Sequence, residues 1–176
     1  MTTEENTMTT INFPDPATLP DTLREALSTH TANIYRMVAH SHGMGLSFLT
    51  MADAMLQTNS VPFPLRELAI LRVGHVYAAP YELHHHEKFA RAVGLSEDAI
   101  AAAATGGGEG LRSEEAAVLR WTDTILDQHT LGAVARTEAL ELFSVAELAD
   151  FVLTVGFYQL VCNFLNTFEV TTEGEA

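Results

Sequence analysis

The stretch from residue 64 to residue 94 constrains the fold most, because its two helical patterns place titratable residues among apolar ones. Its sequence is PLRELAILRVGHVYAAPYELHHHEKFARAVG. The first predicted helix begins after Pro64, which suits a first helical turn, and reaches about Tyr77. The second begins near Pro80 and ends at Gly94, a residue suited to the left-handed position after a helix. Polar groups in a buried helical segment are typical of an active site.

Three residues of this stretch could form a site for proton transfer. Glu82 and His86 are four residues apart, so they lie on one face of the second helix, one turn from each other. Glu67 lies near the start of the first helix and reaches the same pocket if the two helices pack as an antiparallel or bent pair. Two carboxylates beside an imidazole are suited to general acid/base catalysis. We therefore predict that His86 is the general acid/base and that Glu82 and Glu67 form its proton relay.

The rest of the chain also has helical periodicity. In addition to the two helices above, we expect helices at about residues 22–40, 46–56, 97–104, 113–128, 137–143 and 144–166. Asp21, Ser96 and Ser113 are predicted N-caps, and Ser144 with Glu147 reads as a capping box. No segment shows the convincing period-two alternation of a strand. The sequence therefore predicts an all-α fold, a compact bundle of about seven to eight helices.

The predicted domain organisation is simple. Residues 1–20 contain three prolines and predict a flexible N-terminal arm. A single helical domain is expected over residues 21–168, followed by a polar tail at 169–176. The last predicted helix contains FVLTVGFYQLVCNFLN, which is apolar nearly all round. Since a surface helix has a polar face, this helix is expected at the centre of the bundle or buried by another subunit.

Composition limits the classes of partner. The chain has 23 acidic and 9 basic residues and a net charge of −14, so nucleic acid and anionic membranes are not expected partners. The N-terminus lacks the basic and apolar regions of a signal peptide, and no run of 18 apolar residues predicts a membrane span. We therefore expect a cytoplasmic protein. Cys162 is the sole cysteine, which excludes an intramolecular disulfide and a Cys-x-x-Cys pair.

Three segments of the chain resemble the carboxymuconolactone decarboxylase family, whose superfamily includes the alkylhydroperoxidase D-like proteins. They read RELAIL, YELHHHE and ARAVGLS, and begin at residues 66, 81 and 90. Weaker similarity lies at residues 33–40 and 156–163, so the resemblance covers most of residues 30–170. It implies an alkylhydroperoxidase D-like helical fold and a homo-oligomer, a trimer or a hexamer. It also implies proton transfer without a cofactor on a small carboxylated or carbonyl substrate.

The redox branch of this superfamily has a further pattern: Glu, eleven residues, Cys, two residues, Cys, three residues, His. Aligned on Glu67, this pattern places the cysteines at Ala79 and Glu82 and the histidine at His86. The glutamate and the histidine are present, and both cysteines are replaced. Thiol peroxidase activity is therefore not expected, because it requires a thiolate and disulfide exchange.

Four further residues are predicted to bind the substrate: Tyr81, His85, Arg72 and Tyr35. Arg72 could hold a substrate carboxylate, although such arginines also satisfy helix ends or bridge subunits. The two tyrosines are pocket-wall candidates, for which ordinary packing is the alternative. His84 and His85 point about 100° apart on a helix, so the three consecutive histidines cannot all face one pocket.

These features together predict a cofactor-independent enzyme that acts on a small carboxylated lactone or keto acid. The expected reaction is decarboxylation or isomerisation by proton transfer, with no metal ion. One alternative is a metal-assisted lyase or hydrolase, in which Glu82, His86 and a histidine such as His75 or His40 bind the metal. The other is a non-catalytic oligomeric scaffold that kept the fold after the cysteines were lost.

Overall fold

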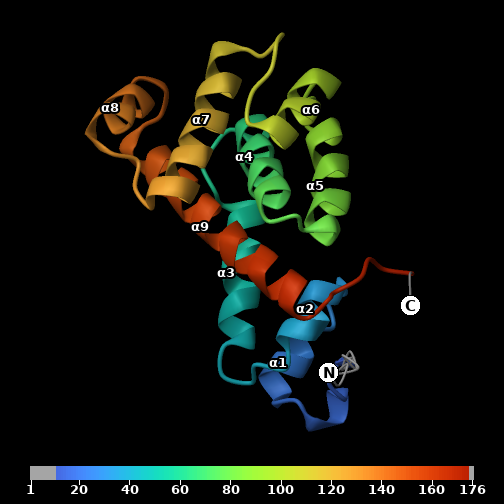
Figure 1. The fold of residues 1–176 in the computed structure, drawn as a ribbon. Helices are drawn as coiled ribbons and strands as arrows, with labels where there is room; N and C mark the ends of the chain where they lie inside the picture. The colour runs from blue at the N-terminus through green and yellow to red at the C-terminus, as the bar shows by residue number, and fades with distance from the viewer. Residues whose placement is uncertain (1–10, 175–176) are drawn as a thin grey trace, which may run out of the picture. The chain divides into compact units, whose positions relative to one another are not determined.

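The computed structural model describes residues 11–174, which form nine α-helices and one 3₁₀ helix and contain no strand (Figure 1). The all-α prediction is therefore confirmed for this part of the chain. The chain divides into two compact units between Met51 and Ala52, inside α3 (Gly45–Gln57). We describe each unit by itself. Residues 1–10 of the predicted arm and residues 175–176 of the predicted tail lie outside the described residues.

The first unit contains short helical elements around a small core. Its elements are a 3₁₀ helix at Pro16–Thr18, α1 at Asp21–Ala26, α2 at Asn33–Val38 and the first half of α3. The buried side chains of its core are Leu19, Leu23, Ala39 and Leu49. Part of the predicted N-terminal arm, from residue 16 to residue 19, thus forms a helical turn and contributes to a core.

The prediction of one helix over residues 22–40 is wrong, because residues 27–32 separate α1 from α2. The hydroxyl of Thr29 donates to the carbonyl oxygen of Ala26 at 3.1 Å. Nδ1 of His30 donates to the same carbonyl at 2.8 Å. Side chains that bond the last carbonyls of a helix compete with the next helical turn, so the apolar periodicity continues while the helix ends.

The predicted capping residues are confirmed at two of four helices. The hydroxyl of Ser96 accepts a backbone hydrogen bond at the start of α6 (Glu97–Thr105). Ser144 and Glu147 form the predicted capping box at the start of α9 (Val145–Thr167). Asp21 and Ser113 instead occupy the first position inside their helices.

The second unit is organised around α4 (Phe63–Val76). The helices that pack against α4 are α5 (Pro80–Ala92), α6, α7 (Ser113–Gln128) and α9, while α8 (Ala133–Leu142) packs against α7 and α9 (Figure 1). Nearly all residues of α4 from Leu65 to Gly74 are buried. A helix enclosed by four others places its polar side chains in the interior, where they need partners.

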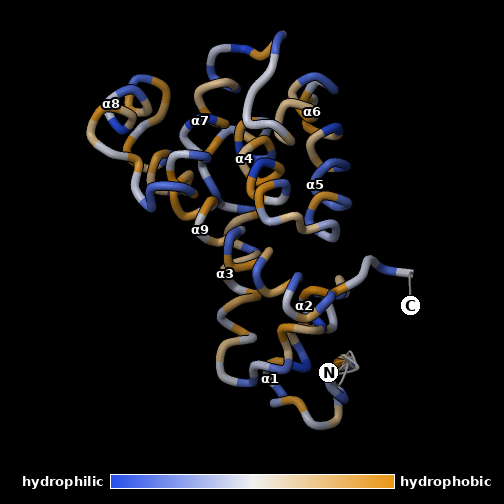
Figure 2. Tube along the Cα trace, in the orientation of Figure 1, coloured by the Kyte–Doolittle hydropathy of each residue, from blue (hydrophilic) through white to orange (hydrophobic). Residues whose placement is uncertain are grey.

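Two apolar clusters stabilise the second unit. One joins α4 to α5, α6 and α7 and contains Leu68, Leu71, Ala90, Leu95, Ala99, Ile100, Ala102, Ala103 and Leu119. The other is aromatic: the rings of Trp121, Phe143 and Phe151 lie 5.7–6.4 Å apart, in edge-on or tilted pairs. The first cluster packs α4 against its neighbours, and the second joins α7 to the start of α9. In Figure 2, α5 carries both hydrophilic and hydrophobic segments along its length.

The long helix α9 combines a buried side with an exposed apolar side. Phe151, Val155 and Cys162 are fully buried, whereas Leu153 and Leu160 are 51% and 53% exposed. Within residues 11–174, α9 is the one helix long and apolar enough to cross a membrane by length and composition, and 44% of its most apolar window is buried in the fold. Burial of that kind is typical of a core helix. The cytoplasmic location stays a prediction.

Candidate active site

The hairpin of α4 and α5 positions the predicted catalytic residues. Ala78 in the short connection has φ +47°, and the amide of Ala79 donates to the carbonyl oxygen of Gly74 at 3.0 Å. These contacts reverse the chain within three residues. Gly74 is buried, and a Cβ there would lie 3.0 Å from Cδ2 of Leu83, so glycine permits the close approach of the two helices. Glu67 is thereby brought opposite His86.

Glu67, Glu82 and His86 form one interior cluster, as predicted. Nδ1 of His86 donates to Oε2 of Glu67 at 2.6 Å, and Nε2 lies 2.9 Å from Oε1 of Glu82. The three side chains are only 3–8% exposed. Oε1 of Glu82 has no partner in hydrogen-bond geometry, so its contact with Nε2 is an ion pair without a well-aligned hydrogen bond. We call these three residues the triad.

The triad carries an imidazole that holds its proton. Burial is the largest single influence and by itself lowers the pKa of His86. The charge of Glu82, the hydrogen bond to Glu67, the short contact of Nε2 with Glu82 and the charge of Glu67 together outweigh burial and raise the pKa of His86 to about 10. His86 is therefore an imidazolium at neutral pH, with one ring N–H directed at each carboxylate.

Two aromatic rings line the imidazole of His86. The ring of Tyr158 in α9 and the ring of Phe89 in α5 lie edge-on to it, with centroids 5.1 Å and 5.4 Å away. Tyr158 is buried, whereas Phe89 is half exposed. Of the two, Phe89 is the neighbour of His86 that reaches the surface.

Arg72, a predicted substrate-binding residue, is engaged by the protein itself. Its Nε donates to Oδ1 of Asp123 at 2.5 Å, and its Nη1 donates to the carbonyl oxygens of Ala103 and Ala104 at 3.1 and 3.0 Å. These bonds tie α4 to α7 and to the end of α6. They leave few donors of Arg72 for a substrate carboxylate. The alternative role given above, in which the arginine satisfies a helix end, fits these contacts better.

Tyr81 and His85, also predicted to bind the substrate, contact a residue near the C-terminus. The hydroxyl of Tyr81 donates to Oε1 of Glu173 at 2.7 Å, and Nε2 of His85 lies 3.0 Å from Oε2 of the same carboxylate. Burial lowers the pKa of His85, and the charge of Glu173 opposes that effect. A pocket of about 520 Å³ lies beside Tyr81, between the start of α5 and residues 165–172. Tyr35 belongs to the first unit, where its ring packs edge-on against His30.

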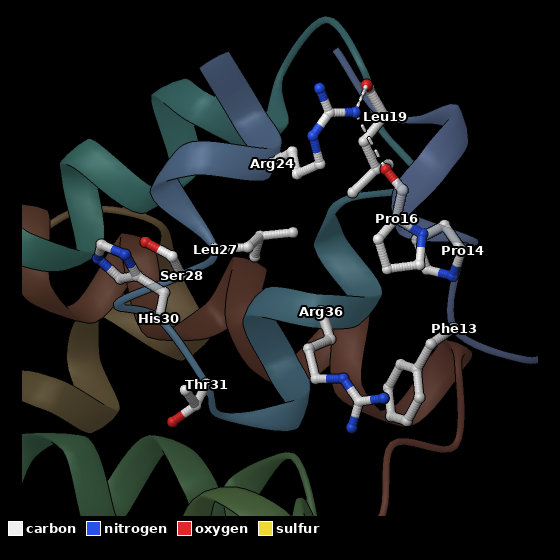
Figure 3. A pocket seen from close by; sticks show the side chains of 10 residues that line it. All are labelled: Phe13, Pro14, Pro16, Leu19, Arg24, Leu27, Ser28, His30, Thr31 and Arg36. Atoms are coloured by element: carbon white, nitrogen blue, oxygen red, sulfur yellow. Dashed lines mark hydrogen bonds between the residues drawn. The ribbon is translucent and has the colours of Figure 1, made fainter. Parts of the chain in front are cut away.

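Four pockets of the described residues are lined by side chains other than the triad. Within the second unit, pockets of about 520, 570 and 560 Å³ are each lined by residues other than the triad. A pocket of about 480 Å³ in the first unit is shown in Figure 3. There Arg36 stacks on the ring of Phe13 at 3.8 Å, and Arg24 donates to the carbonyl oxygens of Pro16 and Leu19. Both cations of this pocket are thus used by the chain itself.

The structure also bears on the two other chemistries considered for this chain, metal binding and thiol chemistry. Within residues 11–174, no group of three or more His, Cys, Asp or Glu residues is arranged to hold a metal ion. Both ring nitrogens of His86 face carboxylate oxygens, so neither is directed at a shared cation. Burial, with a smaller contribution from the charge of Glu82, raises the pKa of the Cys162 thiol far above its ordinary value. Cys162 is therefore a protonated interior residue rather than a nucleophile.

Comparisons with known proteins agree with the predicted resemblance. Residues 44–124, which include the triad, match the sequence model of the carboxymuconolactone decarboxylase family. Among solved structures, the chain is similar to an alkylhydroperoxidase AhpD core, an uncharacterized peroxidase-related protein from Ralstonia eutropha JMP134, with a TM-score of 0.79. The two chains are 18% identical, and the match covers 94% of this chain and 92% of that one. The likeness shows that the fold is alkylhydroperoxidase D-like. A comparison with curated proteins gave no match.

Proposed function

We propose that this chain, which has the alkylhydroperoxidase D-like fold and matches the carboxymuconolactone decarboxylase family over residues 44–124, is a cofactor-independent acid/base enzyme. Its substrate would be a small carboxylated lactone or keto acid. The observation that carries the proposal is the imidazole of His86 held between the carboxylates of Glu67 and Glu82. Titratable groups that perturb one another in the interior are typical of sites that move protons.

The triad suggests a distinct role for each residue. The imidazolium of His86 is the general acid, because its raised pKa keeps the proton in place until a stronger base forms. Glu67 positions the ring through its 2.6 Å hydrogen bond with Nδ1. Glu82 is the proton acceptor, since its Oε1 has no aligned hydrogen bond to break before it takes a proton.

In a decarboxylation, the bond between the substrate's α-carbon and its carboxylate breaks, and carbon dioxide leaves. The electron pair of that bond remains on the substrate as an enolate. Nε2–H of His86 then protonates the α-carbon, and a proton from solvent restores the imidazolium. In an isomerisation, Glu82 removes a proton from one carbon and His86 delivers one to another, so no net charge changes. Both sequences use the same three residues.

Access to the triad is the main requirement that this function adds. The triad side chains are nearly enclosed, so a neighbouring side chain has to move aside before a substrate can reach them. Phe89 meets this requirement, because it packs on the imidazole and is half exposed. We place the substrate entrance at Phe89.

The protein is also proposed to be a homo-oligomer, a trimer or a hexamer. The exposed apolar side of α9 supports this part of the proposal. Its members are Val145, Val152, Leu153 and Leu160, which are 43–75% exposed in the single chain. Contiguous exposed apolar residues on one helix are typical of an interface between subunits.

A non-catalytic scaffold is the second candidate, and the near-complete enclosure of the triad favours it. In a scaffold, the buried carboxylate–imidazolium–carboxylate cluster would have a structural role alone, which is to hold α4 against α5. The two candidates differ in one property: the enzyme exchanges protons with a substrate, and the scaffold does not.

Proton exchange provides the test. A panel of small lactones and keto acids is incubated with the protein in D₂O, and deuterium incorporation and loss of carbon dioxide are followed by NMR. We expect His86→Gln and Glu82→Gln to reduce the rate of the wild-type reaction by about 100-fold or more. Glu87→Gln is the matched control, because Glu87 lies on α5 and contacts Arg91 at the surface. Full turnover by both triad variants would refute the acid/base assignment, and wild-type protein inert towards the whole panel would favour the scaffold.

A further inference from the structure

The pocket of the first unit is lined by basic and apolar residues. Its volume is about 480 Å³, and its basic side chains are Arg24, His30 and Arg36. Among the described residues, no aspartate or glutamate lines this pocket. The whole chain has 23 acidic and 9 basic residues, so a pocket with basic side chains and no carboxylate departs from the overall charge. A local excess of positive charge favours an anionic ligand.

The head group of Arg36 is only partly used by the chain. Its Nη1 donates to Oδ1 of Asn33 at 3.1 Å, and its guanidinium carbon lies 3.8 Å from the centroid of the Phe13 ring (Figure 3). These contacts occupy one terminal nitrogen and one face of the guanidinium. Within residues 11–174, no acceptor bonds Nε or Nη2 and no carboxylate pairs with Arg36. Arg36 is exposed, so a ligand can reach it from solvent.

The two nitrogens of Arg36 without a protein acceptor form a binding edge. Nε and Nη2 lie on the same edge of a guanidinium, and their N–H bonds are nearly parallel. This fork matches the two oxygens of a carboxylate. Stacking on Phe13 leaves the edge open, because the ring covers a face and the N–H bonds lie in the guanidinium plane. It also restrains the head group before a ligand arrives, which lowers the entropy cost of binding.

The second arginine of the pocket is neutralised by the chain. Arg24 forms an ion pair with Asp21, and its Nη1 donates to the carbonyl oxygens of Pro16 and Leu19 at 3.4 and 3.3 Å. Arg36 is therefore the arginine of this pocket whose charge has no partner among the described carboxylates.

The rest of the lining suits an apolar ligand body. Leu19 is buried in the core of the first unit, and Leu27 packs against that core. Pro14 and Pro16 line the same pocket (Figure 3). An apolar surface beside a carboxylate-binding edge is typical of sites where one polar group fixes the orientation of an otherwise apolar ligand.

We propose that this pocket binds a small carboxylate with an apolar body, and that Arg36 holds the carboxylate through its Nε and Nη2. All residues that line the pocket belong to the first unit, whereas the triad belongs to the second. The site is therefore distinct from the triad and goes beyond the proposed function, since binding there needs no turnover.

The test measures binding of benzoate, a carboxylate with an apolar ring, to the full chain. Benzoate is titrated at constant ionic strength in chloride, and binding is followed by calorimetry and by saturation-transfer NMR. Benzyl alcohol has the ring without the charge, and phosphate has the charge without the ring. We expect benzoate to bind the wild-type protein more tightly than either, because the pocket offers a carboxylate fork and an apolar wall.

Substitutions locate the binding at Arg36. Arg36→Met should weaken benzoate binding by about fivefold or more, because it removes a bidentate ion pair at an accessible site. Arg36→Lys keeps the charge without the fork and should also bind benzoate more weakly than the wild type. Arg136→Met is the matched control, because Arg136 is an exposed arginine of α8 in the second unit. It should bind benzoate as the wild type does, and all three variants should keep the wild-type unfolding temperature within a few degrees.

Three results would overturn the proposal. The first is equal benzoate binding, or none, in the wild type and in Arg36→Met. The second is phosphate binding as tight as that of benzoate, which would mean that the apolar body is not recognised. The third is benzoate binding that is lost in His86→Gln and kept in Arg36→Met, which would place the carboxylate at the triad. Because His86→Gln is expected to bind benzoate normally while it loses turnover, failure of this site and failure of the acid/base site are distinguished.

Discussion

Glu67 and His86 are separated by 19 positions in the sequence, yet they share a 2.6 Å hydrogen bond in the interior of the second unit. The reversal of the chain between α4 and α5 makes this contact, and Glu82 completes it from the next turn of α5. The result is one positive group between two carboxylates, with almost no contact with solvent. The properties of this protein that can be measured most directly follow from that arrangement.

The first prediction concerns stability against pH. The folded protein holds the His86 proton with a pKa of about 10, whereas the histidine of the unfolded chain has a pKa near 6.5. The stabilisation is therefore complete below about pH 6.5 and is lost as the pH rises towards 10. We expect the free energy of unfolding, measured with urea, to fall across this window by on the order of a few kcal/mol more in the wild type than in His86→Gln. Parallel pH profiles in the two proteins would contradict the prediction.

The second prediction concerns the causes of that pKa. Glu82→Gln removes the charge that faces Nε2, so the pKa of His86 should fall by roughly one to three pH units. Titration of the imidazole ¹⁵N signals measures it directly. Glu87→Gln, at the surface of the same helix, should leave the titration unchanged, and equal curves for the wild type and Glu82→Gln would show that Glu82 does not stabilise the imidazolium.

The third prediction concerns the end of α6. Gly106 has φ +80°, and a Cβ there would lie 2.5 Å from Oδ2 of Asp123 and 3.1 Å from the guanidinium carbon of Arg72. Gly106→Ala should therefore destabilise the protein by roughly 1–3 kcal/mol, through backbone strain and displacement of the Arg72–Asp123 pair. Gly107→Ala is the control, because a Cβ at Gly107 meets no atom within 4 Å and should change stability by less than about 0.5 kcal/mol. Chemical denaturation compares the two, and indistinguishable midpoints would refute the argument.

The fourth prediction concerns the proposed oligomer. Leu153→Glu and Leu160→Glu place a charge on the exposed apolar side of α9, where each leucine is about half exposed. In a subunit interface, a buried unpaired charge is costly, so both variants should dissociate to a smaller species. Light scattering after size-exclusion chromatography gives the mass. Val134→Glu, at an 86% exposed position of α8, is the control and should keep the wild-type mass. An unchanged mass for all three variants would place the interface elsewhere.

Local sequence signals predicted much of the fold and of the triad. The capping pair of Ser144 and Glu147 and the four-residue spacing of Glu82 and His86 depend on neighbours within one turn, and both are present in the structure. The break between α1 and α2 was missed, because the apolar periodicity runs through it. Thr29 and His30 end α1 by donating hydrogen bonds to the carbonyl oxygen of Ala26, and these bonds cannot be read from the sequence.

The arginines show the opposite case. Arg72 and Arg66 lie six positions apart on one apolar helix, and both look equally available in the sequence. The partner of Arg72 is Asp123, 51 residues away, and no sequence spacing predicts that contact. Tyr81 and Glu173, 92 residues apart, are a further example. Residues are therefore easily assigned a binding role when the acceptor that occupies them lies far along the chain.

By itself, the sequence determined that the fold is all-helical, that Glu82 shares a helical face with His86, and that Glu67 lies near the start of the preceding helix. Those properties follow from backbone periodicity and from contacts within a few residues. The protonated state of His86, the engagement of Arg72 and the incomplete bonding of Arg66 were decided only by the tertiary structure. The physical reason is that charge in a protein interior is governed by burial and by partners from distant helices, which only the folded chain brings together.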